Sequence, residues 1–324
     1  MDSELNKKLI VTILKHISEN KKPVNYLVNA LSISRESAYR RIRGDIPFTV
    51  QELVTLVADL GFSIDVIFEQ EKQNRSFYDY SRNEKNPSDF FVLMLKKYSE
   101  LLEKISFSKK LDTIMAFNSF PPPFYAGYYN LFKFSYYKWL YQDKEIMRNE
   151  SYSNLILPDM AFVYQRKMRE NLIQGKNTIL ILDTNIFLNL IKEVQYFYNR
   201  KLLTNEEVLL IKEDTIRMIE QFEESTQTGD FGSAKVQLYL SPLCVSSNTI
   251  YYKLDDKAEP LFWLFTINPV IIQNTGLVSM QIKWLNSLKR QSALITQSNE
   301  IMQAEFFFKQ REYINMFLSI DSSV

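Results

Sequence analysis

The sequence predicts a mostly α-helical protein: an all-α N-terminal domain, then a larger α-rich α+β domain with a small antiparallel sheet. Three observations support this fold class. Apolar residues recur at three- and four-residue spacing through most of the 324 residues, β-prone runs appear only between residues 235 and 267, and only 7 residues are glycine. A polar, charged stretch over 69–88 separates the two parts. We expect domains at 1–70 and 87–324, joined by a linker over 71–86.

Four short helices are expected in the first domain. The first helix has one apolar face, made of Leu5, Leu9, Ile10, Ile13, Leu14 and Ile17. Pro23 suits the first turn of a second helix, and Ser34 is a suitable N-cap for a third helix that ends before Gly44. Thr49 and Glu52 have the spacing of a capping box, which predicts a fourth helix.

The second domain mixes helical patterns with β-prone runs. Helices are expected over 88–105, 125–141, 184–202, 204–224, 279–288 and 298–318. Strands are expected over 235–245, 248–254 and 261–267, and the first two of them can pair as a hairpin around residues 246–247. The aromatic run between Tyr125 and Tyr141 has the spacing of a buried packing surface, with a ligand-lining surface as the alternative.

The scarce residues exclude several classes of chemistry. One histidine (His16) and one cysteine (Cys244) cannot supply the three or four ligands of a Cys/His zinc site. A single cysteine also forms no disulfide within the chain, and no glycine-rich phosphate loop occurs. We therefore expect no cofactor and no metal, no catalytic task for His16, and a buried, inert thiol at Cys244. Because the N-terminus has no apolar signal segment, we expect a cytoplasmic protein without a membrane anchor.

Charge is unevenly distributed within the first domain. The whole chain has a net charge of +1, which favours neither nucleic acid nor membrane. Between Lys15 and Arg43, however, there are seven cations and two anions, whereas residues 44–70 contain five anions and no cation. A helix, a short turn and a second helix over 24–43 have the geometry that places the second helix in the DNA major groove. The basic side of this domain would then face the DNA.

This domain resembles the Cro/repressor-type (XRE-like) helix-turn-helix family over roughly residues 5–68. The residues that carry the resemblance are Leu27, Ile33, Ser34, Arg35, Arg43, Gly44, Pro47, Leu53, Leu56, Val57, Ala58, Leu60, Gly61, Ser63 and Asp65. Three positions depart from the family's pattern: Val24 stands where glutamine is frequent, Val28 where a small alanine is usual, and Ser32 at the turn glycine. The departures concern the fine geometry of the two helices.

The resemblance implies a transcriptional regulator that binds double-stranded DNA as a two-fold dimer and is not an enzyme. The second domain matches no family on its residues. We expect it to hold a homodimer together, to sense a small-molecule or peptide effector, or both.

The same resemblance places a recognition helix at about residues 35–42. The candidate DNA-binding residues are Arg35, Glu36, Ser37, Tyr39, Arg40, Arg41, Arg43 and Asn25. The first three are expected at base edges, since arginine can bridge guanine and glutamate can accept from cytosine, with Tyr39 and Arg40 one turn further on. Arg41 and Arg43 are expected at phosphates, and Asn25 can replace the missing glutamine's phosphate contact. The alternative is a solvated helix face without a ligand.

Two other functions remain open. Residues 179–185 resemble the opening strand of the PIN-type ribonucleases, in which Asp183 would bind a metal ion together with further carboxylates. The candidate partners are Glu193, Glu206, Glu207, Glu213 and Asp214. A helix cap is the simpler interpretation of Asp183, because no alternation of strands and helices is expected after it. The third possibility is an adaptor whose helix-turn-helix fold binds protein.

Overall fold

The computed structural model describes residues 2–17, 22–60, 62, 86–106, 111–142, 151–171, 177–232, 234–254, 257–264, 268–271 and 275–318. The chain divides into two compact units, 1–79 and 80–324. Apart from Asn86, the linker expected over 71–86 lies outside the described residues, as do Gly61, Ser63 and Asp65. Among the described helices, none combines the length and the apolar character that crossing a bilayer requires.

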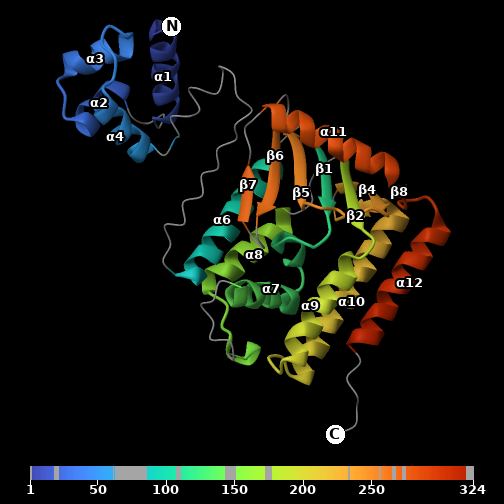
Figure 1. Cartoon of the computed structure of the whole chain (residues 1–324). Coiled ribbons are helices and arrows are strands. Elements are labelled where there is room, and N and C mark those ends of the chain that lie inside the picture. Colours follow the sequence, from blue (N-terminus) through green and yellow to red (C-terminus); the bar gives the residue numbers. More distant parts are fainter. Residues whose placement is uncertain are drawn as a thin grey trace. The chain divides into compact units, whose positions relative to one another are not determined.

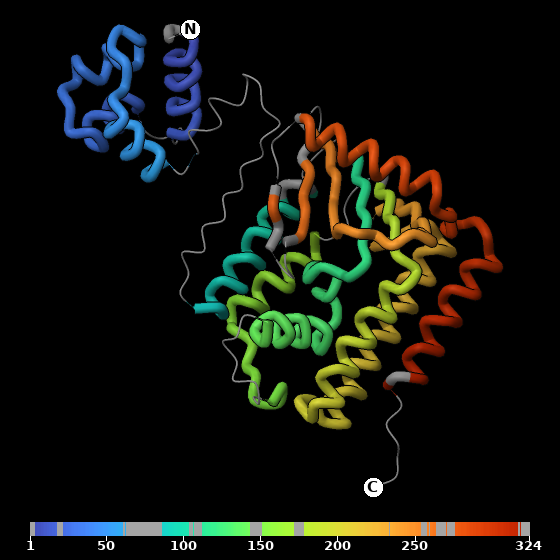
Figure 2. The backbone as a smooth tube through the Cα atoms, in the orientation of Figure 1, coloured from blue at the N-terminus to red at the C-terminus, as the bar shows by residue number. Residues whose placement is uncertain are grey.

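The first unit consists of short helices around a small apolar core (Figure 2, blue). The helices are α1 (Asp2–His16), α2 (Pro23–Leu31), α3 (Arg35–Arg43) and α4 (Val50–Leu60). The core contains Leu9, Ile10, Ile13, Ile17, Leu27, Ala38, Phe48, Leu56 and Phe62. The apolar face expected for the first helix is thus buried, except that Leu5 is exposed and Leu14 is half-buried.

Local signals set the ends of these helices. Pro23 occupies the first turn of α2, and Ser32 ends that helix with a φ of 53°, in the left-handed region that costs a serine free energy. Ser34 caps α3, because its hydroxyl accepts a hydrogen bond from the N–H of Ser37 at 3.2 Å. Gly44 ends α3 with a φ of 81°, which glycine adopts without that cost.

The second unit is built on a mixed sheet with helices on both faces (Figure 1). Its helices are α6 (Pro87–Ser106), α7 (Tyr129–Gln142), α8 (Asp159–Asn171), α9 (Ile186–Asn199), α10 (Asn205–Thr228), α11 (Thr275–Gln291) and α12 (Glu300–Phe317), with single 3-10 turns at Pro122–Tyr125 and Tyr152–Asn154. Its strands are β1 (Leu111–Phe117), β2 (Asn177–Asp183), β3 (Asp230–Phe231), β4 (Ala234–Ser241), β5 (Thr249–Leu254), β6 (Lys257–Leu264), β7 (Asn268–Ile271) and β8 (Ala293–Leu294). The described chain is mostly helical, as the sequence predicts.

The sheet is mixed, and not antiparallel as the sequence predicts. Its strand order is β3-β4-β2-β1-β5-β6-β7, with β8 beside β4. The strands β1, β2 and β4 are parallel, and the other pairs are antiparallel. Parallel neighbours need long crossover connections, which α7 with α8 and α9 with α10 provide. The antiparallel prediction is wrong because its strands all begin after residue 234 and so omit β1 and β2.

The hairpin expected around residues 246–247 does not form. Instead β4 pairs with β2 while β5 pairs with β1, so the connection over 242–248 passes the carboxyl ends of β2 and β1. Side chains at those ends hold it. The carboxylate of Asp183 accepts from the N–H of Val245 at 3.1 Å, and Nδ2 of Asn118 donates to the Val245 carbonyl at 2.6 Å. These contacts direct the chain across β2 and β1 before β5 begins.

The two scarce side chains are both exposed. Cys244 belongs to the connection after β4 and is exposed, which corrects the expectation of a buried thiol: β4 ends at Ser241, so the residue does not reach the sheet. His16 is exposed at the end of α1, where its Nδ1 lies 2.9 Å from the Thr12 carbonyl and its ring 5.0 Å from that of Phe62.

The sheet separates two apolar layers. Along β2, Leu180 and Leu182 face the large core formed with α6 to α10, whereas Ile181 faces α11. On that second face, Leu285 and Leu288 of α11 are buried against the sheet. Figures 1 and 2 show α11 running across the strands on its own side, with α12 beside α9 and α10.

The aromatic run is part of the large core, in agreement with the packing interpretation. The buried residues of α7 are Leu131, Phe132, Phe134, Ser135, Tyr136, Tyr137, Trp139 and Leu140. Asp214 of α10 fixes the beginning of this helix: its Oδ2 accepts from the N–H groups of Asn130 at 2.6 Å and Leu131 at 3.3 Å. The other oxygen pairs with Arg217. Burial raises the pKa of Tyr125 well above its usual range, so the phenol before α7 stays neutral.

Candidate nucleic-acid interface

The exposed side of α3 collects most of the residues predicted to bind DNA. On α3 the exposed ones are Arg35, Glu36, Tyr39, Arg40 and Arg43, and Asn25 on α2 is exposed as well. Tyr39 is 54% exposed although it is a large aromatic residue. The opposite side of the helix is anchored by Ala38, which is fully buried in the core of the first unit. The helical phase of α3 therefore presents cations and an aromatic ring outward together.

Arg35 connects α3 with α2. Its Nη2 donates to Oδ1 of Asn25 at 3.1 Å, and both side chains are exposed. The structure thus brings together one residue predicted to contact a base and the residue predicted to replace the family's glutamine. An exposed hydrogen bond of this kind can be exchanged for one to a ligand at little cost.

Arg41 occupies a different environment from its neighbours. It is 8% exposed, and its guanidinium binds Glu52 of α4 through Nε to Oε2 at 3.1 Å and through Nη2 to Oε1 at 2.6 Å. A third hydrogen bond, from Nη1, reaches the hydroxyl of half-buried Ser37 at 2.5 Å. This bidentate pair ties α3 to α4. The geometry therefore favours a positioning role for Arg41 over the phosphate contact expected from the sequence.

Glu52 has two tasks at once. Its Oε2 accepts from the N–H of Thr49 at 2.8 Å, while the hydroxyl of Thr49 accepts from the N–H of Glu52 at 3.2 Å, which completes the predicted capping box of α4. Burial alone would raise the pKa of this carboxyl, but the hydrogen bonds from Arg41 and Thr49 outweigh burial and lower it. The carboxylate is therefore ionised when it holds the two helices together.

The described anions after α3 all have partners within the unit. Asp45 lies 3.1 Å from the guanidinium of Arg43, with both side chains about half-exposed or more, so this pair is weak and exchangeable. Asp59 accepts from the hydroxyl of Tyr26, and the pKa of that tyrosine is raised by burial and by this carboxylate. The two further anions of the predicted acidic stretch, Asp65 and Glu69, lie outside the described residues.

The alternative site at Asp183 does not gather the carboxylates that a metal centre needs. After β2 the chain forms the helices α9 and α10 and then the strands β3 to β7 in succession, so strands and helices do not alternate after Asp183, in agreement with the expectation. Asp183 is 5% exposed and accepts backbone hydrogen bonds from Asn185 at 2.8 Å and Val245 at 3.1 Å. Across the described residues, no group of three His, Cys, Asp or Glu side chains is placed to hold a metal ion.

Three of the five carboxylates named as partners of Asp183 have other contacts. Glu193 pairs with Lys138 at 2.7 Å, and Glu207 forms the capping box of α10 with Thr204. Asp214 holds the start of α7, as described above. The Thr204–Glu207 capping box agrees with the helix start that the sequence predicts.

One residue of this interface was not predicted from the sequence. Glu52 was recognised only as a helix cap, and its pairing with Arg41 was not. The pair lies 11 residues apart across a turn, so no helical spacing connects them.

The comparisons with known proteins add no relative. No family model matches the chain, and no curated protein or solved structure shows significant similarity to it.

Proposed function

We propose that the protein is a cytoplasmic, sequence-specific DNA-binding transcriptional regulator whose first unit is a helix-turn-helix domain of the Cro/repressor type. In this proposal α3 is the recognition helix and enters the major groove. The second unit holds two copies together, so that two recognition helices read a palindromic site.

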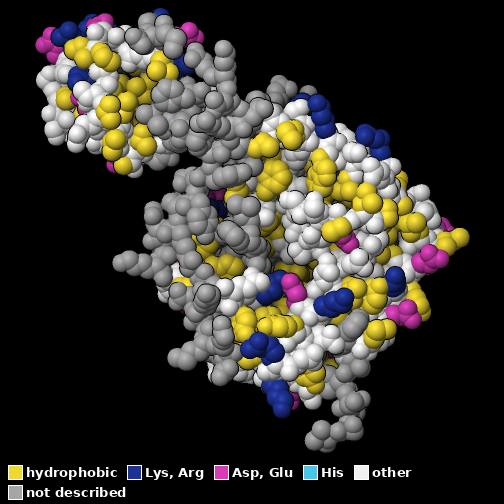
Figure 3. Space-filling view, in the orientation of Figure 1, with side chains coloured by type: hydrophobic (Ala, Val, Ile, Leu, Met, Phe, Trp, Pro, Cys, Tyr) yellow, Lys and Arg dark blue, Asp and Glu magenta, His cyan; other side chains and the backbone are white. Residues whose placement is uncertain are grey.

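The observation that carries the proposal is the outward side of α3. Arg35, Tyr39 and Arg40 are exposed, while the Arg41–Glu52 pair fixes the helix from behind. Arginine at base edges and at phosphates is the commonest source of DNA contacts. On the face of the second unit seen in Figure 3, by contrast, the described Lys and Arg side chains are interspersed with acidic and uncharged ones.

The test is enrichment of bound duplexes from a randomised pool at about 150 mM salt, followed by sequencing. We expect an enriched motif of two inverted half-sites. Replacing Arg35 or Arg40 by alanine should weaken binding to that motif by about ten- to a hundredfold, corresponding to one lost base contact each. Lys7→Ala is the matched control, because it removes an exposed cation of α1 from the same unit and should change affinity by less than about twofold.

The other outcomes separate the alternatives. A single half-site would contradict the dimer and leave DNA reading intact. No enriched motif, with Arg35→Ala and Lys7→Ala indistinguishable, would contradict DNA reading and favour an adaptor that binds protein.

A further inference from the structure

Exposed apolar side chains of the second unit gather where α7 begins. Tyr129, the first residue of that helix, is 49% exposed, and its ring is stacked on that of Phe162 of α8 with 6.1 Å between the centroids. The segments before and within α8 and at the start of α10 add further large apolar side chains that are exposed: Ile156, Met160, Val163, Leu209 and Leu210. Single exposed apolar residues are common at protein surfaces, whereas a group of them on one surface marks an interaction site.

Leu210 belongs to this group because of its place on α10. It lies one helical turn after Glu207 and one turn before Asp214, so the three share one side of the helix. Glu207 accepts a hydrogen bond from the hydroxyl of Ser153, in the turn before α8, at 2.7 Å. Asp214 accepts from the N–H of Asn130, at the start of α7, at 2.6 Å. The side of α10 that carries Leu210 therefore adjoins the start of α7 and the chain that leads into α8.

The helices α8 and α10 lie on either side of the start of α7 and run in the same direction. Near their starts they are connected by the hydrogen bond between Ser153 and Glu207. Further along, both lie close to Tyr128: burial raises the pKa of this tyrosine to about 12, and the guanidinium groups of Arg217 on α10 and Arg169 on α8 act against the rise. Because the two helices are close at both points, positions along one are level with positions along the other.

The exposed charges of the two helices differ in sign. The exposed cations of α8, all in its second half, are Arg166, Lys167 and Arg169, and its exposed anions are Asp159 and Glu170. The exposed anions of α10 are Glu206, Glu213, Glu220 and Glu224, while Arg217, an exposed cation, already pairs with Asp214. Neither Arg166 nor Glu213 forms an ion pair with another described residue, so both can bind a charge outside the chain.

We propose that this surface is the interface with a second copy of the chain. A two-fold axis along the common direction of α8 and α10 sets α8 of each copy against α10 of the other. At the level of Tyr129, Val163 then faces the partner's Leu210, and one turn further Arg166 faces the partner's Glu213. Apolar side chains thus meet apolar ones and cations meet anions, so a second copy is the partner that this surface fits. The inference rests on the proposed function for a second unit that holds two copies together, and not on DNA binding.

The test is sedimentation velocity of the full-length protein without DNA. We expect a dimer with a Kd below about 10 µM. Val163→Glu should weaken self-association about hundredfold, because the new carboxylate would lose water in the apolar part of the interface. Met280→Glu is the matched control: Met280 is also exposed, but on α11, which covers the other face of the sheet. This control should change the Kd by less than about twofold.

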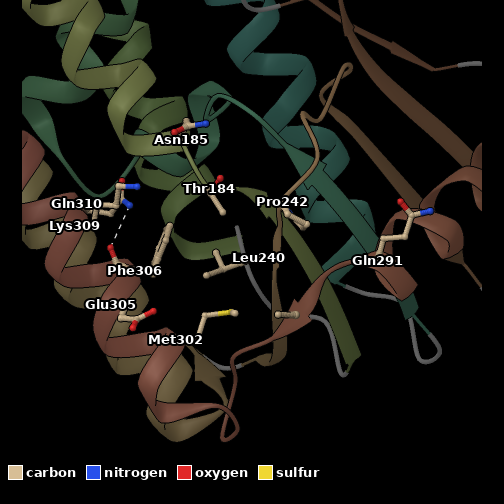
Figure 4. A pocket seen from close by; sticks show the side chains of 11 residues that line it. Thr184, Asn185, Leu240, Pro242, Gln291, Met302, Glu305, Phe306, Lys309 and Gln310 are labelled. Carbon is tan, nitrogen blue, oxygen red and sulfur yellow. Dashed lines mark hydrogen bonds between the residues drawn. The ribbon is translucent and has the colours of Figure 1, made fainter.

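Charge reversal distinguishes this arrangement from other dimers. Arg166→Glu and Glu213→Arg should each weaken self-association about hundredfold, because like charges then face each other twice in the symmetrical dimer. Mixed in equal amounts, the two variants should associate about as tightly as the wild type, because every facing pair is again one cation and one anion. Lys309→Glu is the matched control and should leave self-association unchanged. Lys309 is exposed on α12, where it borders a cleft of about 430 Å³ between that helix and the end of β4 (Figure 4).

A protein that is monomeric at about 100 µM, a dimer insensitive to Val163→Glu and to both charge reversals, or a mixture that stays monomeric would each overturn the inference. The substituted residues are exposed, so the variants should keep the wild-type circular dichroism, and association of the mixture requires that both variants fold. A monomer that still enriches a single half-site would overturn the inference and leave DNA reading intact. The proposed dimer without any enriched motif would overturn DNA reading and leave the interface assigned.

Discussion

Each unit of the chain contains a carboxylate that fixes the start of a helix, but the two carboxylates reach their helices across different distances in the sequence. Glu52 caps α4, its own helix, and stands three residues from Thr49. Asp214 lies within α10 and holds the first N–H groups of α7, 84 residues earlier at Asn130. The first unit is therefore organised largely by neighbouring residues, and the second by contacts between distant segments.

The units also differ in what their surfaces offer. In the first unit, arginine side chains on α3 are exposed and do not belong to the apolar core. The second unit places most of its aromatic residues in the core and leaves a cleft beside α12. Tryptophan fluorescence reports on the second unit alone, because that unit contains all three tryptophans of the chain: Trp139, Trp263 and Trp284. The predictions below use it to distinguish unfolding of the two units.

The largest effect is expected for Glu52→Ala. It leaves the guanidinium of Arg41 buried without its anion and removes the cap of α4, which should destabilise the first unit by about 4 kcal/mol. In urea unfolding, part of the helical circular dichroism should be lost at a lower urea concentration than in the wild type. The urea midpoint of the tryptophan fluorescence change should stay the same. Glu4→Ala, which breaks an exposed pair with Lys8 at 3.7 Å, is the control and should change little. A shift in the fluorescence midpoint would contradict the independence of the two units.

Asp214→Ala should have the opposite effect and destabilise the second unit rather than the first. Two backbone N–H groups at the start of α7 lose their acceptor in a buried site, at a cost of about 3 kcal/mol. The fluorescence midpoint should fall, because Trp139 is on α7. Asp214→Asn keeps one acceptor oxygen and should cost clearly less; equal losses for the two variants would argue against hydrogen bonding as the cause.

Acid should affect the first unit through Glu52. Its pKa in the folded protein is lowered from the ordinary value of 4.5, so the ionised carboxylate stabilises the fold above about pH 4.5. This stabilisation is lost as the pH falls through the lower, folded-state pKa. Thermal unfolding followed by circular dichroism between pH 7 and pH 3 should show a decline that is flatter in Glu52→Gln. Parallel declines in both proteins would assign the acid sensitivity to other groups.

The smallest effects concern the turn between α2 and α3. Ser32→Gly should stabilise the first unit by about 0.5 kcal/mol, because glycine relieves the left-handed strain at a φ of 53° but loses more entropy on folding. Ser34→Ala, two residues later, should destabilise it by about 1 kcal/mol through loss of the α3 cap. The opposite signs are the test: destabilisation by both changes would mean that Ser32 makes a contact of its own.

The same contrast explains how much could be predicted from the sequence. In the first unit, Ser34, Gly44 and the Thr49–Glu52 box are local signals, and the observed helices follow them. In the second unit the capping box at Thr204 was equally readable. The sequence did not predict which strands pair with each other, because the pairing depends on contacts between distant residues, such as that of Asp183 with Val245, 62 residues apart.

The candidate sites divide in the same way. The helix-turn-helix resemblance named Arg35, Tyr39 and Arg40 as candidate base contacts, and all three are exposed on α3. The sequence did not predict that the Arg41 side chain is buried and bound to Glu52 of α4. The cleft beside α12 is lined by residues of the turn after β2 and by residues of α12 more than 100 positions later, so no sequence motif contains it.

In the proposed function, the Arg41–Glu52 pair has a consequence for the rate of DNA binding. A recognition helix that is already bound to the neighbouring helix loses little conformational entropy when it docks on the duplex. Collision and electrostatic steering then govern how quickly complexes form, and formation rates should be similar for good and poor sites. Discrimination between operators should therefore appear in how long each complex lasts.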